Sequence, residues 1–159
     1  MKKTTSIILS GILTLSAMGT VFAENDNEEI LLTSAAPQTA YTLKVNNDSI
    51  DAEIYSENNH IMVPLRALAE KLGFTVTWDD TDKSIVLDNN TVKTSIAIGT
   101  DSYYMSASPS TGLIGMSAPS PLGAAPVLKD SKTYVPIEMF GLLLGDDTYT
   151  VKDYSISFN

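Results

Sequence analysis

Metal binding is the first chemistry that the residue types of this sequence could support. The sequence has no cysteine and one histidine, His60, and imidazole and thioether groups are both ligands for copper. Beyond residue 23 the methionines are Met62, Met105, Met116 and Met139. None of them forms a Met-x-x-Met pair, and methionine commonly fills gaps in a core. We therefore expect these side chains to pack rather than to bind copper.

Three carboxylates, Asp79, Asp80 and Asp82, lie within four residues, and carboxylate oxygens suit Ca²⁺. The segment lacks the glycine and the terminal glutamate of a twelve-residue calcium loop. Asp and Thr are also ordinary turn residues. We expect a β-turn here, and keep His60 and these aspartates as weak metal candidates.

Catalysis has no support in the residue pattern. Hydrolysis needs a nucleophile beside a base, or two opposed carboxylates. The sequence has neither a Gly-x-Ser-x-Gly nor a Ser-x-x-Lys motif, and its carboxylates are scattered over expected turns. We therefore predict no catalytic residues, no cofactor and no enzymatic activity.

Arg66 is the only arginine in the sequence, and the pattern around it predicts the first turn of a helix. A cation there is mildly unfavourable against the helix dipole. A bidentate bond to a carboxylate, such as one on a neighbouring turn, would explain it. A ligand anion would explain it as well, so Arg66 is a candidate binding residue.

A second candidate binding region is residues 106–125, a segment rich in Ser, Pro, Gly and Ala that contains no charged residue. The two tyrosines just before it are adjacent, so one would face outward in a strand. An apolar loop beside an outward tyrosine is typical of a recognition surface, whereas a flexible linker-like insertion is the alternative. The candidates are Tyr103, Tyr104, Met105, Leu113, Ile114 and Met116. Trp78, by contrast, alternates in phase with Phe74 and Val76, and we expect it in the core.

The elements that must position these residues follow a clear order. Residues 41–46 and 49–55 alternate as a hairpin, and residues 61–63 continue the strand pattern. Pro64 suits the start of a helix, whose apolar positions have the spacing i, i+3, i+4 and i+7. Gly73 suits its C-terminal cap. Residues 74–78 and 84–88 then form a hairpin, and residues 91–99 and 101–106 suggest another.

This unit recurs 72 residues later. The matched positions are Val63-Pro64 with Val135-Pro136, Leu65 with Ile137, Leu68 with Phe140, and Leu72-Gly73 with Leu144-Gly145. The sequence therefore predicts an internal repeat. We expect an α+β fold in which antiparallel hairpins pack on two short helices, in one and a half copies of a strand–helix–hairpin repeat.

Composition divides the chain into three parts. Residues 1–23, with Lys2, Lys3, a short apolar stretch from about Ile7 to Phe22 and a cleavage site after Ala23, predict a cleaved signal peptide and a secreted protein. Residues 24–40 predict a flexible acidic leader, and residues 41–159 predict one α+β domain. The net charge of −9 disfavours nucleic acid as a partner, and we expect no stable membrane insertion after cleavage.

The run "VPLRALAEKLGFTVTWDDTDKSIVL", followed by a strand ending in Ile-Gly, then by Ala-Pro-Val and Tyr-Val-Pro, resembles a bacterial family. It is similar to the copper amine oxidase N-terminal-like, or stalk, domain of exported Gram-positive proteins. The resemblance covers about residues 41–158 and implies a non-catalytic α+β appendage. Two features depart from the family pattern. In the second copy of the repeat, Glu138 occupies the position that Arg66 has in the first, and the 106–125 loop replaces a tight hairpin connection.

We interpret the chain as a non-enzymatic exported module, binding or structural, at the bacterial cell surface. Its expected partner is a protein or a cell-wall glycan, and association with the wall would follow. An apolar loop or an edge strand could also serve self-association. The alternative is a metal-handling extracellular protein, for copper or calcium.

Overall fold

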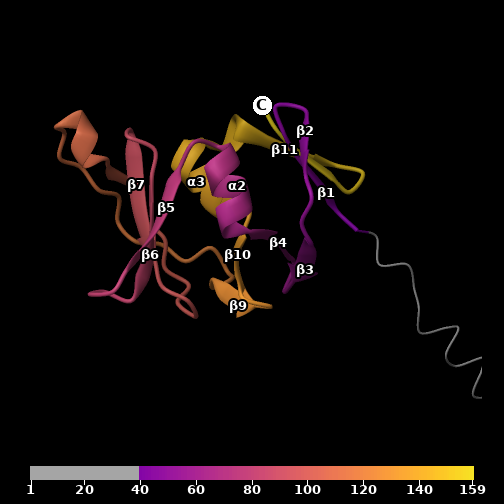
Figure 1. Ribbon diagram of the computed structural model, residues 1–159, viewed down its shortest axis with the longest axis horizontal. Coiled ribbons are helices and arrows are strands. Elements are labelled where there is room, and N and C mark those ends of the chain that lie inside the picture. Colours follow the sequence, from indigo (N-terminus) through magenta and orange to yellow (C-terminus); the bar gives the residue numbers. More distant parts are fainter. Residues whose placement is uncertain (1–39) are drawn as a thin grey trace, which may run out of the picture. The chain divides into compact units, whose positions relative to one another are not determined.

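The computed structural model describes residues 40–159 (Figure 1). The expected signal peptide and all of the expected leader except residue 40 lie outside the described residues.

Three four-stranded sheets organise the described part of the chain. Sheet A has the order β11 (Tyr149–Lys152), β12 (Ser155–Phe158), β1 (Thr42–Val45), β2 (Asp48–Ile50). Sheet B has the order β3 (Tyr55–Glu57), β4 (His60–Pro64), β10 (Lys132–Pro136), β9 (Val127–Lys129). Sheet C has the order β5 (Thr75–Asp79), β6 (Ser84–Asp88), β7 (Val92–Ile96), β8 (Ser106–Ala107).

Two α-helices, α2 (Leu65–Lys71) and α3 (Glu138–Leu144), lie between sheets C and A in Figure 1. The 3₁₀ turns are η2 (Pro109–Thr111) and η3 (Asp146–Thr148). This arrangement confirms the predicted α+β class with two short helices. Neither helix of the described residues is long and apolar enough to cross a membrane.

Four two-residue turns set the register of the hairpins in sheets A and B. Both residues of each turn have a positive φ, for example 49° and 71° at Asn46-Asn47. The other three are Asn58-Asn59, Asp130-Ser131 and Asp153-Tyr154. Two consecutive positive φ values define the type I′ turn, whose twist matches that of paired strands. Asn and Asp favour it because they tolerate this conformation better than most residues.

The two proposed repeats meet at the centre of sheet B. β4 and β10 are antiparallel, and Val63 pairs with its counterpart Val135. Each of these strands ends in a proline, and a seven-residue helix follows. The helix start differs slightly from the prediction, because Pro64 is the last strand residue and α2 begins at Leu65. This geometry is consistent with the repeat.

Gly73 ends the first helix as its sequence position predicts. Its φ is 86°, and its N–H donates to Glu70 O at 3.2 Å. Phe74 N–H donates to Ala69 O at 2.9 Å. These two bonds form a Schellman motif, which satisfies carbonyls left free at the helix end and directs the chain into β5.

The hydrophobic core joins α3 and one face of α2 to residues from all three sheets. Its largest fully buried members include Phe140, Phe158, Leu43, Leu68 and Leu87. Phe140 and Phe158 pack edge to face with their ring centroids 6.1 Å apart. This core fixes the positions of the elements around it, including those that surround the candidate site.

The sequence did not predict that β1 pairs with β12 in parallel, although the antiparallel hairpins that it predicted are present. Two details of the strand prediction were wrong. The strand expected over residues 49–55 divides at Asp51–Ile54, and its two ends join different sheets. The strand expected at residues 101–106 begins only at Ser106. Alternation identifies extended chain, but it does not identify the neighbouring strand.

The 106–125 segment has a defined path rather than that of a structureless linker. Tyr103 and Ser120 exchange two backbone hydrogen bonds of 2.9 Å each. Ala107 N–H donates to Gly115 O at 2.9 Å. The Asp101 carboxylate accepts from the N–H groups of Leu122 and Gly123 at 2.8 and 3.0 Å. These bonds hold the loop against β8 and the chain before it.

Candidate functional site

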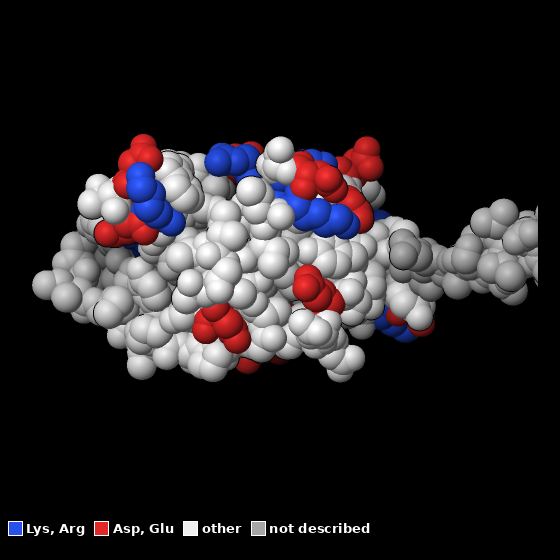
Figure 2. Space-filling view, turned by 90° about the horizontal axis from the view of Figure 1, so that it is seen from below, with Lys and Arg blue, Asp and Glu red and all other residues white. Residues whose placement is uncertain are grey.

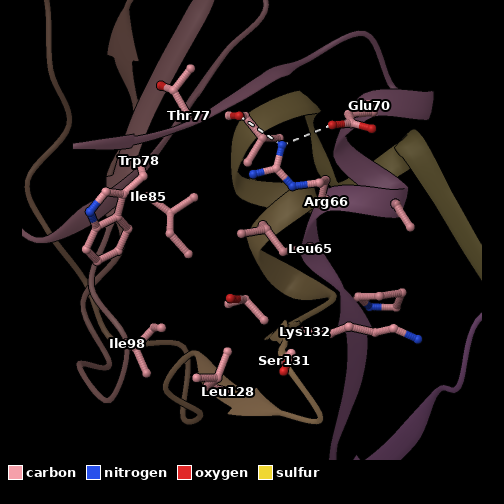
Figure 3. Close-up of a pocket in the computed structure, with 14 residues that line it drawn as sticks. Leu65, Arg66, Glu70, Thr77, Trp78, Ile85, Ile98, Leu128, Ser131 and Lys132 are labelled. Carbon is pink, nitrogen blue, oxygen red and sulfur yellow. Dashed lines mark hydrogen bonds and ion pairs between the residues drawn. The ribbon is translucent and has the colours of Figure 1, made fainter. Parts of the chain in front are cut away.

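A groove of about 580 Å³ opens between α2, the β5–β6 hairpin and the β9–β10 hairpin (Figure 3). Its apolar walls come from Leu65, Val76, Trp78, Ile85, Ile98 and Leu128. Its polar rim includes Arg66, Glu70, Thr77, Ser131, Lys132 and Thr133. Figure 3 shows Trp78, Ile85, Ile98 and Leu128 around the hollow, while the Lys132 ammonium points away from it.

Three of these apolar side chains are well exposed: Trp78 at 50%, Ile98 at 42% and Leu128 at 61%. They come from β5, from the chain after β7 and from β9, so the fold gathers them from distant parts of the sequence. Single exposed apolar residues are common, but a group that lines one hollow is typical of a binding site.

Trp78 was predicted to lie in the core, and this prediction was wrong. It faces the same way as Val76 and pairs with Ile85, but the core ends before its position. Its indole Nε1–H donates to Asp80 Oδ1 at 3.0 Å, at the surface. Strand alternation determines which face of the sheet a side chain lies on. It does not determine how far along the strand the core covers that face.

Arg66 lies at the rim of the groove, where it joins α2 to β5. One guanidinium nitrogen donates to Glu70 Oε1 at 3.2 Å and to the Val76 carbonyl at 3.1 Å. A carboxylate partner is therefore present, but it lies on the same helix rather than on a neighbouring turn, and the contact is not the predicted bidentate bond. The Arg66 side chain is mostly exposed, so water screens this pair and its contribution to stability is small.

The edge of β5 adds backbone hydrogen-bonding groups to the groove. Within the described residues β5 pairs only with β6. Phe74 N–H and Val76 C=O are both directed at α2. Because backbone groups alternate along a strand with period two, the N–H and C=O of Trp78 lie on this same edge. An edge strand of this kind is a template for another extended segment.

The tyrosines predicted for recognition do not form a surface. Tyr103 is fully buried, and its hydroxyl donates to Ala124 O at 2.7 Å. Burial, with a smaller contribution from Asp101 and Glu138, raises the pKa of Tyr103 well above its usual range. Tyr104 and Met105 are half-buried. The expectation of a contact role for Tyr103 was wrong, because the chain at residues 101–105 packs under the loop instead of forming an open strand.

The loop tip does expose the predicted apolar residues. We define the tip as residues 112–116, in which Leu113, Ile114 and Met116 are largely or fully exposed. A shallow hollow of about 260 Å³ lies beneath it, beside Met105 and Met116. The tip is one continuous stretch of sequence, unlike the groove.

The aspartates proposed for calcium serve the β5–β6 turn. Asp79 Oδ1 accepts from the N–H groups of Thr81 and Asp82, at 2.8 and 3.4 Å. These bonds, the Thr81 bond first, lower the pKa of Asp79. Asp80 accepts from the Trp78 indole and from Lys83. The turn geometry therefore matches the role predicted for these residues in place of calcium binding.

The residues proposed for copper are not brought together. His60 Nδ1 lies 3.3 Å from Glu138 Oε1. Met62 and Met139 are buried in different apolar clusters, and Met116 is exposed at the loop tip. Across residues 40–159 no three His, Cys, Asp or Glu side chains are grouped so that they could hold a metal ion. This donor set does not fit copper.

The groove lies in a part of the chain that has known relatives. The family described as copper amine oxidase N-terminal domain matches residues 44–152, which include every residue that lines the groove. The chain belongs to this family. The domain is an N-terminal accessory domain and not the catalytic one, so the family relationship favours a non-catalytic accessory module.

A protein of Brevibacillus choshinensis named "Protease inhibitor" is 27% identical over 154 residues. The match covers 92% of this chain and 43% of that protein. The chain thus spans less than half the length of this relative.

Sequence reasoning missed the groove because Ile98 was treated as an ordinary strand residue and Leu128 was not singled out. A signal for Leu128 was present. The turn Asp130-Ser131 fixes the β9–β10 register and pairs Leu128 with Thr133, one position away from the buried Tyr134. Neighbouring positions on a strand face opposite ways, so the burial of Tyr134 places Leu128 on the other face. No comparable signal brings Ile98 and Trp78 to that face.

Proposed function

We propose that this chain is an exported, non-enzymatic module that binds an extended segment of another protein in the groove beside Trp78. The observation that carries the proposal is the gathering of Trp78, Ile98 and Leu128 around one hollow at the free edge of β5. The signal-like residues 1–23 support export, and secretion to the cell surface is part of the same proposal.

An extended segment suits the groove for two reasons. The outward backbone groups of Trp78 can form strand-type hydrogen bonds, which give affinity with little dependence on sequence. The apolar walls can then receive alternate side chains of the bound segment and select among them. A volume of about 580 Å³ lies within the usual range of ligand pockets.

The lining favours protein over glycan. Eight of the 14 residues that line the groove are apolar, and the rim charge of Arg66 is already engaged by Glu70 and Val76. Apolar side chains therefore outnumber polar ones in the lining, which suits the side chains of a peptide better than the hydroxyls of a sugar. The relative named "Protease inhibitor" also supports a protein partner, and proteases are therefore the first class of partner to test.

The sole tryptophan of the sequence, Trp78, makes the test direct. A displayed library of random peptides and a panel of secreted proteases would be bound to the purified protein and to its Leu128→Asp variant. We expect enrichment of peptides with apolar residues at alternate positions, together with a blue shift of Trp78 fluorescence on binding. The Leu128→Asp variant should lose at least about tenfold in affinity, because a charge would face the apolar wall.

Val151→Asp is the matched control, since Val151 is an exposed apolar residue on β11 and does not line the groove. It should bind as the unmodified protein does. Equal binding by Leu128→Asp would overturn the proposal. A fluorescence shift with isolated cell-wall glycan, and none with peptides or proteases, would replace the protein partner by a glycan.

A further inference from the structure

The groove and the loop tip lie at opposite ends of sheet C. Trp78 pairs with Ile85 near the β5–β6 turn, and Ile85 pairs with Ile96. At the other end of the sheet, Val92 pairs with Ala107, from which the loop leaves. The β9 hairpin and the loop are likewise on opposite sides in Figure 1. A loop tip in this position cannot fill the groove of its own molecule.

The tip has the properties of a ligand for such a groove. Leu113, Ile114 and Met116 project from it, and residues 106–125 contain no charge. Backbone bonds from Ala107 N–H to Gly115 O and from Ser117 N–H to Met105 O, of 2.9 and 2.8 Å, hold its base. A segment fixed in this way loses little conformational freedom when it binds.

The charge distribution favours contact at these two places. The sequence carries a net charge of −9, so two copies repel one another over much of their surface. Figure 2 shows one face on which a white band without charged side chains separates the charges along the upper margin from several acidic side chains below it. An uncharged tip that enters an apolar groove brings no like charges together, and the neighbouring Arg66 is already paired with Glu70.

We propose that the loop tip of one copy occupies the groove of a second copy, so that molecules associate head to tail. The inference rests on the proposed function, because the tip would be one occupant of the same groove. Such a contact joins two different surfaces, and it therefore produces rings or open chains instead of a symmetric dimer. The contact is small, so the association is weak, and a foreign partner would compete with it.

Sedimentation velocity over a range of protein concentrations tests the proposal with two single variants. Ile114→Asp changes the tip and Leu128→Asp changes the groove, and both side chains are exposed, so folding should be preserved. We expect the unmodified protein to associate with rising concentration. Each variant alone should associate at least about tenfold more weakly.

Mixing the two variants gives the decisive result. Ile114→Asp retains an intact groove and Leu128→Asp retains an intact tip, so a one-to-one complex should form only in the mixture. If Leu128→Asp also carries Trp78→Phe, it has no tryptophan, and any fluorescence shift comes from the intact groove of Ile114→Asp. The Val151→Asp control should associate as the unmodified protein does.

A concentration-independent monomer, unchanged association of Ile114→Asp, or the absence of a complex in the mixture would overturn the inference. The proposed function and the self-association are distinguished by different outcomes. Groove-dependent binding of library peptides by a protein that stays monomeric would leave that function standing without self-association. A complex in the mixture without any binding of peptides or proteases would leave self-association as the role of the groove.

Discussion

The two helices follow equivalent strand–proline junctions, yet their surroundings differ. α2 buries one stripe and exposes Arg66, Ala67, Glu70 and Lys71. α3 buries most of its surface through Met139, Phe140, Gly141 and Leu143. One copy therefore presents a polar helix face to the groove, while the other forms the centre of the core. A polar substitution should therefore be tolerated on the exposed face of α2 and should destabilise the protein at the equivalent position in α3.

The largest contrast is expected at Ala67 and Met139, which occupy equivalent positions 72 residues apart. Met139→Asp would place an unpaired charge in the core and should cost more than about 4 kcal/mol in the free energy of unfolding. Ala67→Asp, on the exposed face of α2, should change it by less than about 0.5 kcal/mol. Urea denaturation measures both, and similar costs would contradict the division of roles.

The glycines that end the two helices should differ by a smaller amount. Gly73 has a φ of 86°, and Gly73→Ala should cost about 1 kcal/mol because alanine tolerates this conformation poorly. Gly145 has φ 105° and ψ 147°, a region almost restricted to glycine, so Gly145→Ala should cost about 2–3 kcal/mol. Thermal unfolding of both variants provides the measurement. A greater loss in Gly73→Ala would reverse the comparison.

A pH dependence is expected on the core side, near α3. Burial raises the pKa of Tyr103, so the unfolded chain loses this proton first as the pH rises. Its contribution to stability is complete below about pH 10 and falls above it, by at most about 1.4 kcal/mol per pH unit.

Tyr103→Phe isolates this effect from that of Tyr55, Tyr134 and Tyr149, whose pKa values burial also raises. Near neutral pH the variant should be less stable by about 1 kcal/mol, because the Ala124 carbonyl loses its donor. The difference should shrink as the pH rises above 10. Urea denaturation as a function of pH is the measurement, and a constant difference would exclude Tyr103 as the source.

The smallest effect on stability is expected at Arg66. Arg66→Gln removes an exposed pair with Glu70, and the free energy of unfolding should change by less than about 0.5 kcal/mol. Its effect on peptide binding should exceed its effect on folding, because the side chain forms part of the groove rim. Denaturation and fluorescence titration of the same variant measure the two effects. A larger effect on the free energy of unfolding than on peptide binding would show that Arg66 is mainly structural.

The sequence predicted the local units of this fold because their signals are local. The spacing of Leu65, Leu68 and Ala69, followed by Gly73, is sufficient to locate α2 and its end. The parallel pairing of β1 with β12 depends on how distant segments close around the core, and no local pattern encodes it.

The candidate site was predictable only in part for the same reason. Arg66, Leu113, Ile114 and Met116 were recognised by residue type and by their neighbours. The groove joins Trp78, Ile98 and Leu128, which lie far apart along the chain. For Tyr103 and Tyr104 alternation showed that the two would differ, but the loop packed over them determined which one was buried.

The parallel pairing of β1 and β12 has a mechanical consequence. The chain enters β1 at Thr42, beside Ser155, and leaves β12 at Phe158, beside Val45. A pull between these two ends would slide one strand along the other and load all of their hydrogen bonds together. Strands joined at a hairpin would instead separate one bond at a time. The domain is thus built to resist tension along its chain, whatever its groove holds.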